Sequence, residues 1–386
     1  MNNFLDIRIA SLVYGGHGLG FPDGRAVFVP GTAPGDLARI RIVAEKKGYA
    51  FGEVVELLEA SPSRIAPECP NFGRCGGCEY LHLDYDAERA AKQAILTESL
   101  ARIGKIQLQS IPEIESVSGE RFRYRSHAVI KTDLRGQAGF FARHSHDIVP
   151  FPEGGCLLLA GSIGPRPPFA AAGHAGEMCV AFGDNGSIIP EREGAVLREH
   201  ACGIVYERGH RDFFQANRYL REKMLGIVGN YATAVPGDPG GFCDAGCGVG
   251  FFALHLARAG FSGTGFDSST RLVRLARRNA ALNAIRNVTF DAHGFSSMTG
   301  SLRGRKVLVC DPPRAGLDAK ARGIVRALLP AGIVYVSCNP AAFARDCADF
   351  VSAGYALRAL TLIDMFPGTY HIESISLFVR GDERTR

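Results

Sequence analysis

The stretch from Phe242 to Phe252 restricts the fold of this chain more than any other. It reads FCDAGCGVGFF: a short apolar strand ends at Asp244, a turn with three glycines follows, and an apolar helix begins at Phe252. Such glycines let the backbone approach a ligand at the amino end of the helix. From about residue 211 onward, apolar runs alternate with helical patterns, which indicates a parallel sheet with crossover helices. The sequence therefore predicts a doubly wound α/β domain over 211–386.

The residues around this turn favour an adenosyl cofactor over a dinucleotide. Asp244 opens the glycine run that contains Gly246 and Gly248, and an early acid can orient the amine of a methionine moiety. Asp267 ends a second strand, where an acid suits ribose hydroxyls, and Gly294 follows a third strand, where adenine would lie. We therefore expect these five residues to border S-adenosylmethionine, although a glycine loop without a ligand is the simpler alternative.

Two further strands end in chemically distinctive residues. The run 307–310 leads into Asp311-Pro312-Pro313-Arg314, and the run 334–336 leads into Ser337, Cys338, Asn339 and Pro340. Strand ends of an open α/β sheet point into the ligand crevice. Cys338 is therefore a candidate nucleophile, although a free cysteine more often behaves as a small buried hydrophobic residue. In amino methyltransferases an aromatic residue stands where this chain has Arg314, so methylation of a nitrogen by that mechanism is disfavoured.

Three of the eleven cysteines form a compact array, Cys69, Cys75 and Cys78, with C-x5-C-x2-C spacing. Such arrays on glycine-rich loops are typical of iron–sulfur clusters and of structural zinc, and each needs a fourth ligand. The candidates for this ligand are Cys156, the next cysteine in sequence, and Cys179 or His82. The compact array favours a cluster over zinc.

Residues 1–61 are expected to form a small OB-like β-barrel, because short apolar runs are separated by Gly, Pro and Asp turns, one of them at 15–18. Basic and aromatic side chains such as Arg39, Arg41, Tyr49 and Phe51 suit attraction to an RNA backbone and stacking on bases. A solvated rim on a structural domain would have the same composition.

Residues 62–210 are expected to form a central β-rich domain that carries the cysteine array. A helix is predicted over 86–103 from the spacing of its apolar residues. The alternating run RFRYR at 121–125 predicts a strand with three arginines on one face. An exposed arginine face could contact phosphates, and a solvated sheet face would look the same.

The overall composition fits a globular protein that meets a polyanion. Hydrophobic residues make up 46% of the chain, charged residues 22%, and the formal net charge is +5. No apolar run reaches the ~18 residues of a membrane span, and Met1 to Asp6 lack the pattern of a secretory leader. We expect a cytoplasmic monomer that does not bind membranes.

Together these motifs resemble the RNA (uracil-5-)methyltransferases, specifically the branch with an N-terminal TRAM domain and an iron–sulfur cluster. The resemblance covers nearly the whole chain. It rests on the following segments: 15–20 (GGHGLG), 29–31 (VPG), the cysteine array with Cys156, 214–217 (FQAN), 311–314 (DPPR), 337–340 (SCNP), 344–346 (ARD) and 364–373 (DMFPGTYHIE).

The resemblance implies methylation of carbon 5 of a uridine in RNA, with S-adenosylmethionine as cofactor. A thiolate at Cys338 would add to carbon 6, and Glu373 would remove the proton from carbon 5. Asp311 and Gln215 would hold the uracil edge and the cofactor, and Phe251 would border the cofactor. The metal ligands implied by the resemblance are Cys69, Cys75, Cys78 and Cys156, around a [4Fe-4S] cluster, with zinc as the less favoured alternative.

The RNA expected from this resemblance is 23S ribosomal RNA, with the T-loop of tRNA as the second choice. Methylation of a different base or carbon on the same scaffold is one alternative. A non-catalytic RNA-binding factor that keeps the barrel and the cluster is another, but such a factor has no use for Cys338, Asp311 and Glu373 together.

Overall fold

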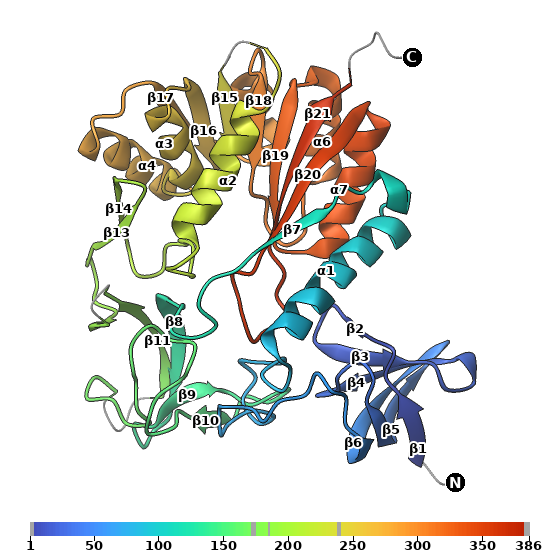
Figure 1. Ribbon diagram of the computed structural model, residues 1–386. Coiled ribbons are helices and arrows are strands. Elements are labelled where there is room, and N and C mark those ends of the chain that lie inside the picture. Colours follow the sequence, from blue (N-terminus) through green and yellow to red (C-terminus); the bar gives the residue numbers. More distant parts are fainter. Residues whose placement is uncertain (1–3, 171–174, 184–185, 238–240, 382–386) are drawn as a thin grey trace. The chain divides into compact units, whose positions relative to one another are not determined.

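The computed structural model describes residues 4–170, 175–183, 186–237 and 241–381. These residues fall into two compact units, each made of segments that are distant in sequence (Figure 1). The first unit comprises 1–95, 120–190 and 366–371, and the second comprises 96–119, 191–365 and 372–386. None of the helices in the described ranges is long and apolar enough to span a membrane.

The first unit begins with a six-stranded sheet in the order β1-β5-β6-β4-β3-β2. Along β5, Ala38 and Ile40 are buried while Arg39 and Arg41 point outward, as the two-residue period of a strand requires. The expected small β-domain is therefore confirmed, but the turn predicted at 15–18 ends earlier, because β3 already begins at His17. The strands are β1 (Phe4–Arg8), β2 (Ser11–Val13), β3 (His17–Gly20), β4 (Ala26–Pro30), β5 (Leu37–Lys46) and β6 (Tyr49–Glu59).

A second sheet of the first unit has the order β10-β9-β8-β11-β12. Its core contains the buried side chains of Ile130, Phe151, Leu159 and Val180. The region is β-rich, as expected. The strands are β8 (His127–Thr132), β9 (Ala138–Phe141), β10 (Ile148–Pro150), β11 (Gly176–Phe182) and β12 (Ile188–Pro190).

The strand predicted over 121–125 is wrong. The backbone turns there, and Arg123 has a φ of +57°. The guanidinium groups donate to backbone carbonyls: Arg121 to Leu83 at 2.8 Å, Arg123 to Cys156 at 3.2 Å, and Arg125 to His127 at 3.2 Å. These arginines therefore stabilise irregular backbone, and the alternation did not arise from a sheet face.

The helix predicted over 86–103 is α1 (Tyr85–Arg102). Its first half carries a fully buried ion pair one turn apart, with Lys92 Nζ 2.9 Å from Glu88 Oε1. This pair holds the segment 366–371: Gly368 N donates to Glu88 Oε1 at 2.7 Å, and Lys92 Nζ donates to the Phe366 carbonyl at 3.2 Å. The segment thus belongs to the first unit, although its neighbours in sequence belong to the second.

The second unit contains an eight-stranded sheet in the order β17-β16-β15-β18-β19-β21-β20-β7. The first five of these strands are parallel, β21 runs antiparallel to β19 and β20, and β7 is parallel to β20. A separate hairpin is formed by β13 (Leu197–Ala201) and β14 (Ile204–Arg208). The sheet strands are β7 (Ile114–Val117), β15 (Phe242–Ala245), β16 (Gly263–Asp267), β17 (Val288–Ala292), β18 (Val307–Cys310), β19 (Gly332–Ser337), β20 (Tyr355–Ile363) and β21 (Ser374–Arg380).

Helices cover both faces of this sheet, which confirms the doubly wound architecture (Figure 1). One face contacts α2 (Arg221–Thr233), α3 (Phe251–Arg258) and α4 (Thr270–Leu282). The other face packs on α5 (Thr299–Leu302), α6 (Ala319–Leu328) and α7 (Pro340–Ser352), together with Leu96 and Leu100 of α1. Three short 3₁₀ helices lie at Pro22–Gly24, Leu108–Ser110 and Phe295–Ser297.

Candidate active site and thiol pocket

Strand register brings the three predicted catalytic residues, Asp311, Cys338 and Glu373, to the end of the eight-stranded sheet where the parallel strands terminate. We call this end of the sheet, defined by these three residues, the catalytic edge. Parallel β18 and β19 both end there, so Asp311 and Cys338 leave the sheet on the same side. Antiparallel β21 starts at this edge, because Ser374 pairs with Ser337. Glu373 and Cys338 are the residues next to this pair, which places them beside each other.

Burial, together with neighbouring carboxylates, opposes ionisation of the acids and of the thiol here. Burial, followed by the carboxylates of Glu373 and Asp311, raises the pKa of Cys338 to about 11, and the guanidinium of Arg314 opposes this rise. Burial also raises the pKa of Asp311 to about 7. Glu373 is 6% exposed, and burial and then the charge of Asp311 raise its pKa well above the ordinary value. Arg314 is therefore the basic residue that favours ionisation at this edge.

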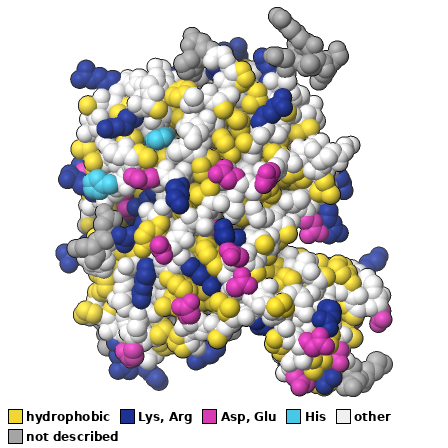
Figure 2. Space-filling model, viewed as in Figure 1, with side chains coloured by type: hydrophobic (Ala, Val, Ile, Leu, Met, Phe, Trp, Pro, Cys, Tyr) yellow, Lys and Arg dark blue, Asp and Glu magenta, His cyan; other side chains and the backbone are white. Residues whose placement is uncertain are grey.

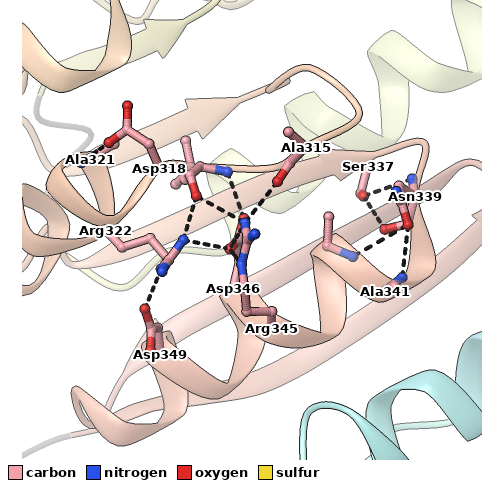
Figure 3. A network of polar contacts seen from close by, with 12 residues as sticks. Ala315, Asp318, Ala321, Arg322, Ser337, Asn339, Ala341, Arg345, Asp346 and Asp349 are labelled. Carbon is pink, nitrogen blue, oxygen red and sulfur yellow. Dashed lines mark hydrogen bonds and ion pairs between the residues drawn. The ribbon is translucent and has the colours of Figure 1, made fainter.

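A network of polar contacts fixes the loop that follows β18 against α7 (Figure 3). The buried carboxylate of Asp346 accepts hydrogen bonds from the backbone N of Leu317 at 2.8 Å and from the hydroxyl of Tyr335 at 2.5 Å. Arg345 donates to the carbonyls of Ala315 and Leu317, both at 2.9 Å. The ARD segment at 344–346 therefore serves to hold the backbone of this loop.

The glycine turn after β15 lies next to this loop, since Asp311 N donates to the Ala245 carbonyl at 3.2 Å. Gly246 has a φ of +82°, and a Cβ there would come within 2.9 Å of the Asp311 carbonyl oxygen, so both conformation and space require glycine. Gly248 has a φ of +54° and open space where a Cβ would lie. Its backbone N donates to Asp267 Oδ2 at 3.1 Å.

Asp244 presents an unused acceptor beside this turn. Its Oδ2 accepts a hydrogen bond from Ala253 N in α3 at 2.8 Å, while its Oδ1 has no partner among the described residues. Burial raises the pKa of Asp244 to about 8. A buried oxygen without a partner next to a glycine turn fits a ligand that supplies a hydrogen-bond donor or a positive charge, as the amine of S-adenosylmethionine would.

The remaining residues predicted for the cofactor lie in different surroundings. Gln215 is buried, and the ring of Phe251 packs against Phe214 with 5.2 Å between the ring centres. Gly294 has open space where a side chain would stand, next to His293, whose ring stacks on Phe266 at 4.3 Å. The structure thus gathers Asp244, Gly246, Gly248 and Asp267 at one turn, and the cofactor roles of Gln215, Phe251 and Gly294 stay predictions.

Four cysteines of the first unit line one pocket of about 600 Å³, which we call the thiol pocket: Cys69, Cys75, Cys78 and Cys156. Burial raises the pKa of Cys75, Cys78 and Cys156, and charge repulsion among these thiolates adds to the rise. Arg143 also lines the pocket and donates to the Cys78 carbonyl. The array and the next cysteine in sequence are therefore together in space.

The two competing fourth ligands do not line the thiol pocket. Cys179 is buried in β11, and His82 Nε2 lies 3.1 Å from the Thr32 carbonyl oxygen. Within the described ranges, no group of three or more His, Cys, Asp or Glu side chains is arranged to hold a single metal ion. The expected iron–sulfur centre is thus not shown by the geometry, which brings the thiols into one pocket but not around one point.

The arginines expected to meet RNA on the N-terminal sheet are engaged in ion pairs. Arg39 lies 2.8 Å from Asp6, and Arg41 lies 2.8 Å from Glu53. Figure 2 accordingly shows acidic and basic side chains interspersed over the visible face. In contrast, Phe51 and Tyr49 form an aromatic cluster with Phe28, with ring centres 5.5 to 5.8 Å apart.

One residue near the candidate catalytic residues, Arg314, was not among the predicted site residues. Arg314 stands in the DPPR segment and acts on the charges of both Cys338 and Glu373. The replacement of an aromatic residue by arginine after Asp-Pro-Pro was the signal that could have identified Arg314.

Comparison with known proteins gives matches to two families, in separate parts of the chain. Residues 195–380 match the tRNA (uracil-5-)-methyltransferase family, and residues 4–55 match the TRAM domain. An uncharacterized RNA methyltransferase of Aquifex aeolicus is 33% identical over 97% of this chain and 98% of its own length. The 23S rRNA (uracil(1939)-C(5))-methyltransferase RlmD of Halomonas elongata is 30% identical over 99% of this chain and 90% of its own length.

A solved structure shows the same fold. The Pyrococcus abyssi tRNA (uracil-54, C5)-methyltransferase in complex with S-adenosyl-L-homocysteine matches with a TM-score of 0.73 and 24% identity, over 97% of this chain and 100% of that one. The full-length relatives and the two matched domains lead to one assignment. The chain belongs to the family of S-adenosylmethionine-dependent RNA uracil-5-methyltransferases with an N-terminal TRAM domain.

Proposed function

We propose that this enzyme methylates carbon 5 of one uridine in 23S ribosomal RNA and that Cys338 is its covalent nucleophile. The observation that carries the proposal is the strand register that sets Cys338, Asp311 and Glu373 at one edge of the sheet, beside the glycine turn. The choice of RNA is supported by the 23S rRNA enzyme of Halomonas elongata, which matches nearly the whole chain.

The chemistry follows from the low reactivity of uracil carbon 5. The thiolate of Cys338 adds to carbon 6, and the electron pair of the 5,6 double bond moves toward oxygen 4. Carbon 5 then takes the methyl group that S-adenosylmethionine supplies. Glu373 accepts the proton of carbon 5, the double bond re-forms, and the thiolate leaves. The raised pKa of Glu373 makes its ionised form a stronger base than an exposed carboxylate.

Further residues of the edge bind and orient. Asp311, half-buried at the end of β18, would hydrogen-bond the uracil edge, and its protonated form could donate because its pKa is about 7. Asp244, Gly246, Gly248 and Asp267 would hold the cofactor, with Gln215, Phe251 and Gly294 completing its site. The target uridine must leave its stack to reach an edge built in this way.

The proposed function is tested with labelled S-adenosylmethionine and unmodified RNA. The purified enzyme and a Cys338→Ala variant are incubated with 23S rRNA and, separately, with tRNA, and labelled nucleosides are identified by mass spectrometry. Labelled 5-methyluridine in 23S rRNA only, absent with the variant, is the expected result. Label in the T-loop of tRNA would replace the proposed substrate, and label at another base or activity of the variant would overturn the proposed chemistry.

We further propose that Cys69, Cys75, Cys78 and Cys156 hold a [4Fe-4S] cluster. A cluster holds its four thiolates further apart than a single zinc ion does, which suits thiols that line a roomy pocket without converging on one point. A cationic centre would also offset the mutual repulsion of these buried thiolates. Zinc is the alternative.

Metal analysis separates these possibilities. After anaerobic purification, iron and sulfide content and visible absorbance are measured for the wild type, for Cys156→Ser and for a Cys179→Ser control. We expect about four irons per chain in the wild type and the control, and strong loss in Cys156→Ser. Stoichiometric zinc without iron would exclude the cluster, and equal iron in all three proteins would exclude Cys156 as a ligand.

Three coarser expectations complete the proposal. The enzyme would act as a monomer in the cytoplasm, where its RNA substrates are made. The TRAM domain would span 1–61, a central RNA-recognition domain with the thiol pocket would span 62–210, and the catalytic domain would span 211–386. Size-exclusion chromatography with light scattering tests the monomer, since a dimer would elute at twice the mass.

A further inference from the structure

Asn339 joins the two loops of the catalytic edge through opposite ends of its side chain (Figure 3). Its Oδ1 accepts hydrogen bonds from the backbone N of Ala341 at 3.0 Å and Ala342 at 3.4 Å, and so caps α7. Its Nδ2 donates to the carbonyl of Arg314 at 3.0 Å. The amide orientation is unambiguous, because the helix end needs an acceptor and the carbonyl needs a donor.

The loop that Asn339 holds turns at Arg314, where Gly316 N donates to the Pro313 carbonyl at 2.7 Å. Pro312 and Pro313 have no backbone N–H to donate. The contacts of Arg345 and Asp346 begin one residue later, at Ala315 and Leu317. The bond from Asn339 therefore acts at the carbonyl of Arg314 itself, and Asn339 directly follows Cys338 in the chain.

We call the hydrogen bond from Asn339 Nδ2 to the Arg314 carbonyl the tether. Its chemical importance lies in the charge of the Arg314 side chain. The charged groups with the largest effect on the Cys338 thiol are Glu373 before β21, Asp311 after β18, and Arg314. Both carboxylates disfavour the thiolate, and the guanidinium of Arg314 favours it. The strength of that effect depends on the separation of Arg314 from the thiol, since charge interactions fall with distance.

We propose that Asn339 is a positioning residue for methyl transfer: its Nδ2 holds the Arg314 loop against the Cys338 turn, so that the guanidinium lies where it stabilises the thiolate. The inference rests on the proposed function only in taking Cys338 as the nucleophile.

The side chain allows its two roles to be separated by substitution. Asn339→Ser keeps an oxygen that caps α7 and adds no charge, but it removes the amide Nδ2 that reaches the Arg314 carbonyl. Asn339→Asp also keeps the cap and places a carboxylate next to the thiol. Asn339→Ala loses both the cap and the tether. Thermal unfolding by circular dichroism shows which variants remain folded, and we expect Asn339→Ser to unfold near the wild type.

The decisive measurement is the rate at which iodoacetamide alkylates Cys338 as a function of pH, followed by mass spectrometry of its peptide. Loss of the tether should raise the pH at which the thiol reacts, slowing alkylation near pH 8 about threefold to tenfold in Asn339→Ser, which corresponds to half to one unit of thiol pKa. Arg314→Gln should slow it at least as much. The Asn339→Ser/Arg314→Gln double variant should be no slower than Arg314→Gln alone, because the tether acts through Arg314.

Three outcomes would overturn the inference: unchanged alkylation in Asn339→Ser, unchanged alkylation in Arg314→Gln, or independent effects that multiply in the double variant. In methylation assays the folded Asn339→Ser variant should lose kcat with little change in KM for RNA. Since alkylation requires no RNA, a wild type without methyltransferase activity would contradict the proposed function, while the alkylation rates alone decide the role of Asn339.

Discussion

At the scale of single residues, three acidic side chains of the candidate site have raised pKa values because they lie in buried surroundings. Asp244, Asp311 and Glu373 all lie where burial disfavours the charged form. Without ligands these acids take up protons that exposed carboxyl groups would have lost. The edge is thus prepared for ligands that bring positive charge or hydrogen-bond donors.

The pH dependence of the free energy of unfolding should reveal the protonation of Asp244. Its pKa is about 8 in the folded protein and near 4 in the unfolded chain, so only the folded state keeps this proton between these values. The contribution of Asp244 to stability without ligands is then fully present below about pH 4 and is lost as pH rises from about 4 to 8, by up to about 1.4 kcal/mol per pH unit. Asp244→Asn should lack this part of the slope in urea unfolding followed by circular dichroism. Parallel curves for both proteins would show that Asp244 is ionised in the fold.

Glu373→Gln should allow methyl transfer to the uracil but prevent release of the methylated uracil from Cys338. Glutamine is similar in size but accepts no proton, so the methylated uracil would stay bonded to Cys338. We expect a covalent protein–RNA complex that survives denaturing gel electrophoresis and is absent when Cys338→Ala is combined with Glu373→Gln. Multiple turnover by Glu373→Gln at the wild-type rate would assign proton removal to another group.

At the scale of elements, α1 depends on a charge pair that water does not reach. Glu88 and Lys92 are fully buried, and both also bind the backbone of 366–371. The same helix carries Arg102 and Glu98, with the same four-residue spacing but exposed side chains. The exposed pair of Glu98 and Arg102 is therefore a control, within the same helix, for the buried pair of Glu88 and Lys92.

Lys92→Met should lower the free energy of unfolding by up to about 3–5 kcal/mol, because it removes the nearer of two cations from the buried Glu88 carboxylate, which keeps Arg121 Nη2 at 3.4 Å. Arg102→Met should cost at most about 1 kcal/mol, since exposed pairs contribute little. Urea unfolding with circular dichroism suits this chain, which has no tryptophan. Similar losses of unfolding free energy in both variants would show that the buried pair contributes no more to stability than the exposed pair.

At the scale of the whole molecule, the arginines of the N-terminal sheet that the sequence suggested for RNA contact already have acidic partners. On the N-terminal sheet, Arg39 and Arg41 are neutralised by acidic partners, while the rings of Phe28, Tyr49 and Phe51 are partly exposed and touch one another. Stacking of bases on these rings is therefore the contribution we expect from this sheet.

Phe51→Ala should weaken RNA binding by about 1–3 kcal/mol without changing affinity for S-adenosylmethionine. Arg41→Ala should change RNA affinity much less, and should leave its salt dependence nearly unaltered, because the guanidinium already pairs with Glu53. Fluorescence anisotropy with labelled RNA at several salt concentrations measures both. A larger loss in Arg41→Ala than in Phe51→Ala would reverse this assignment.

The sequence alone determined which residues stand at strand ends. The apolar runs before Asp244, Asp311 and Cys338 are local patterns, and each is followed by glycine, proline or asparagine that ends the strand. The small N-terminal β-domain and α1 were predicted for the same reason. The false strand at 121–125 shows the limit, since alternation there came from arginines that bind backbone carbonyls.

Only the tertiary structure decided which of these residues meet. Glu373 reaches Cys338 through antiparallel pairing of β21 with β19, and Cys156 joins Cys69, Cys75 and Cys78 across a long stretch of chain. The resemblance had implied both of these groupings, but the partners of Arg41 and Glu88 were not foreseen. Such contacts depend on strand register and on packing between distant segments, which no local pattern encodes. The sequence thus shows which chemical group each residue carries, and the fold decides which other groups surround it.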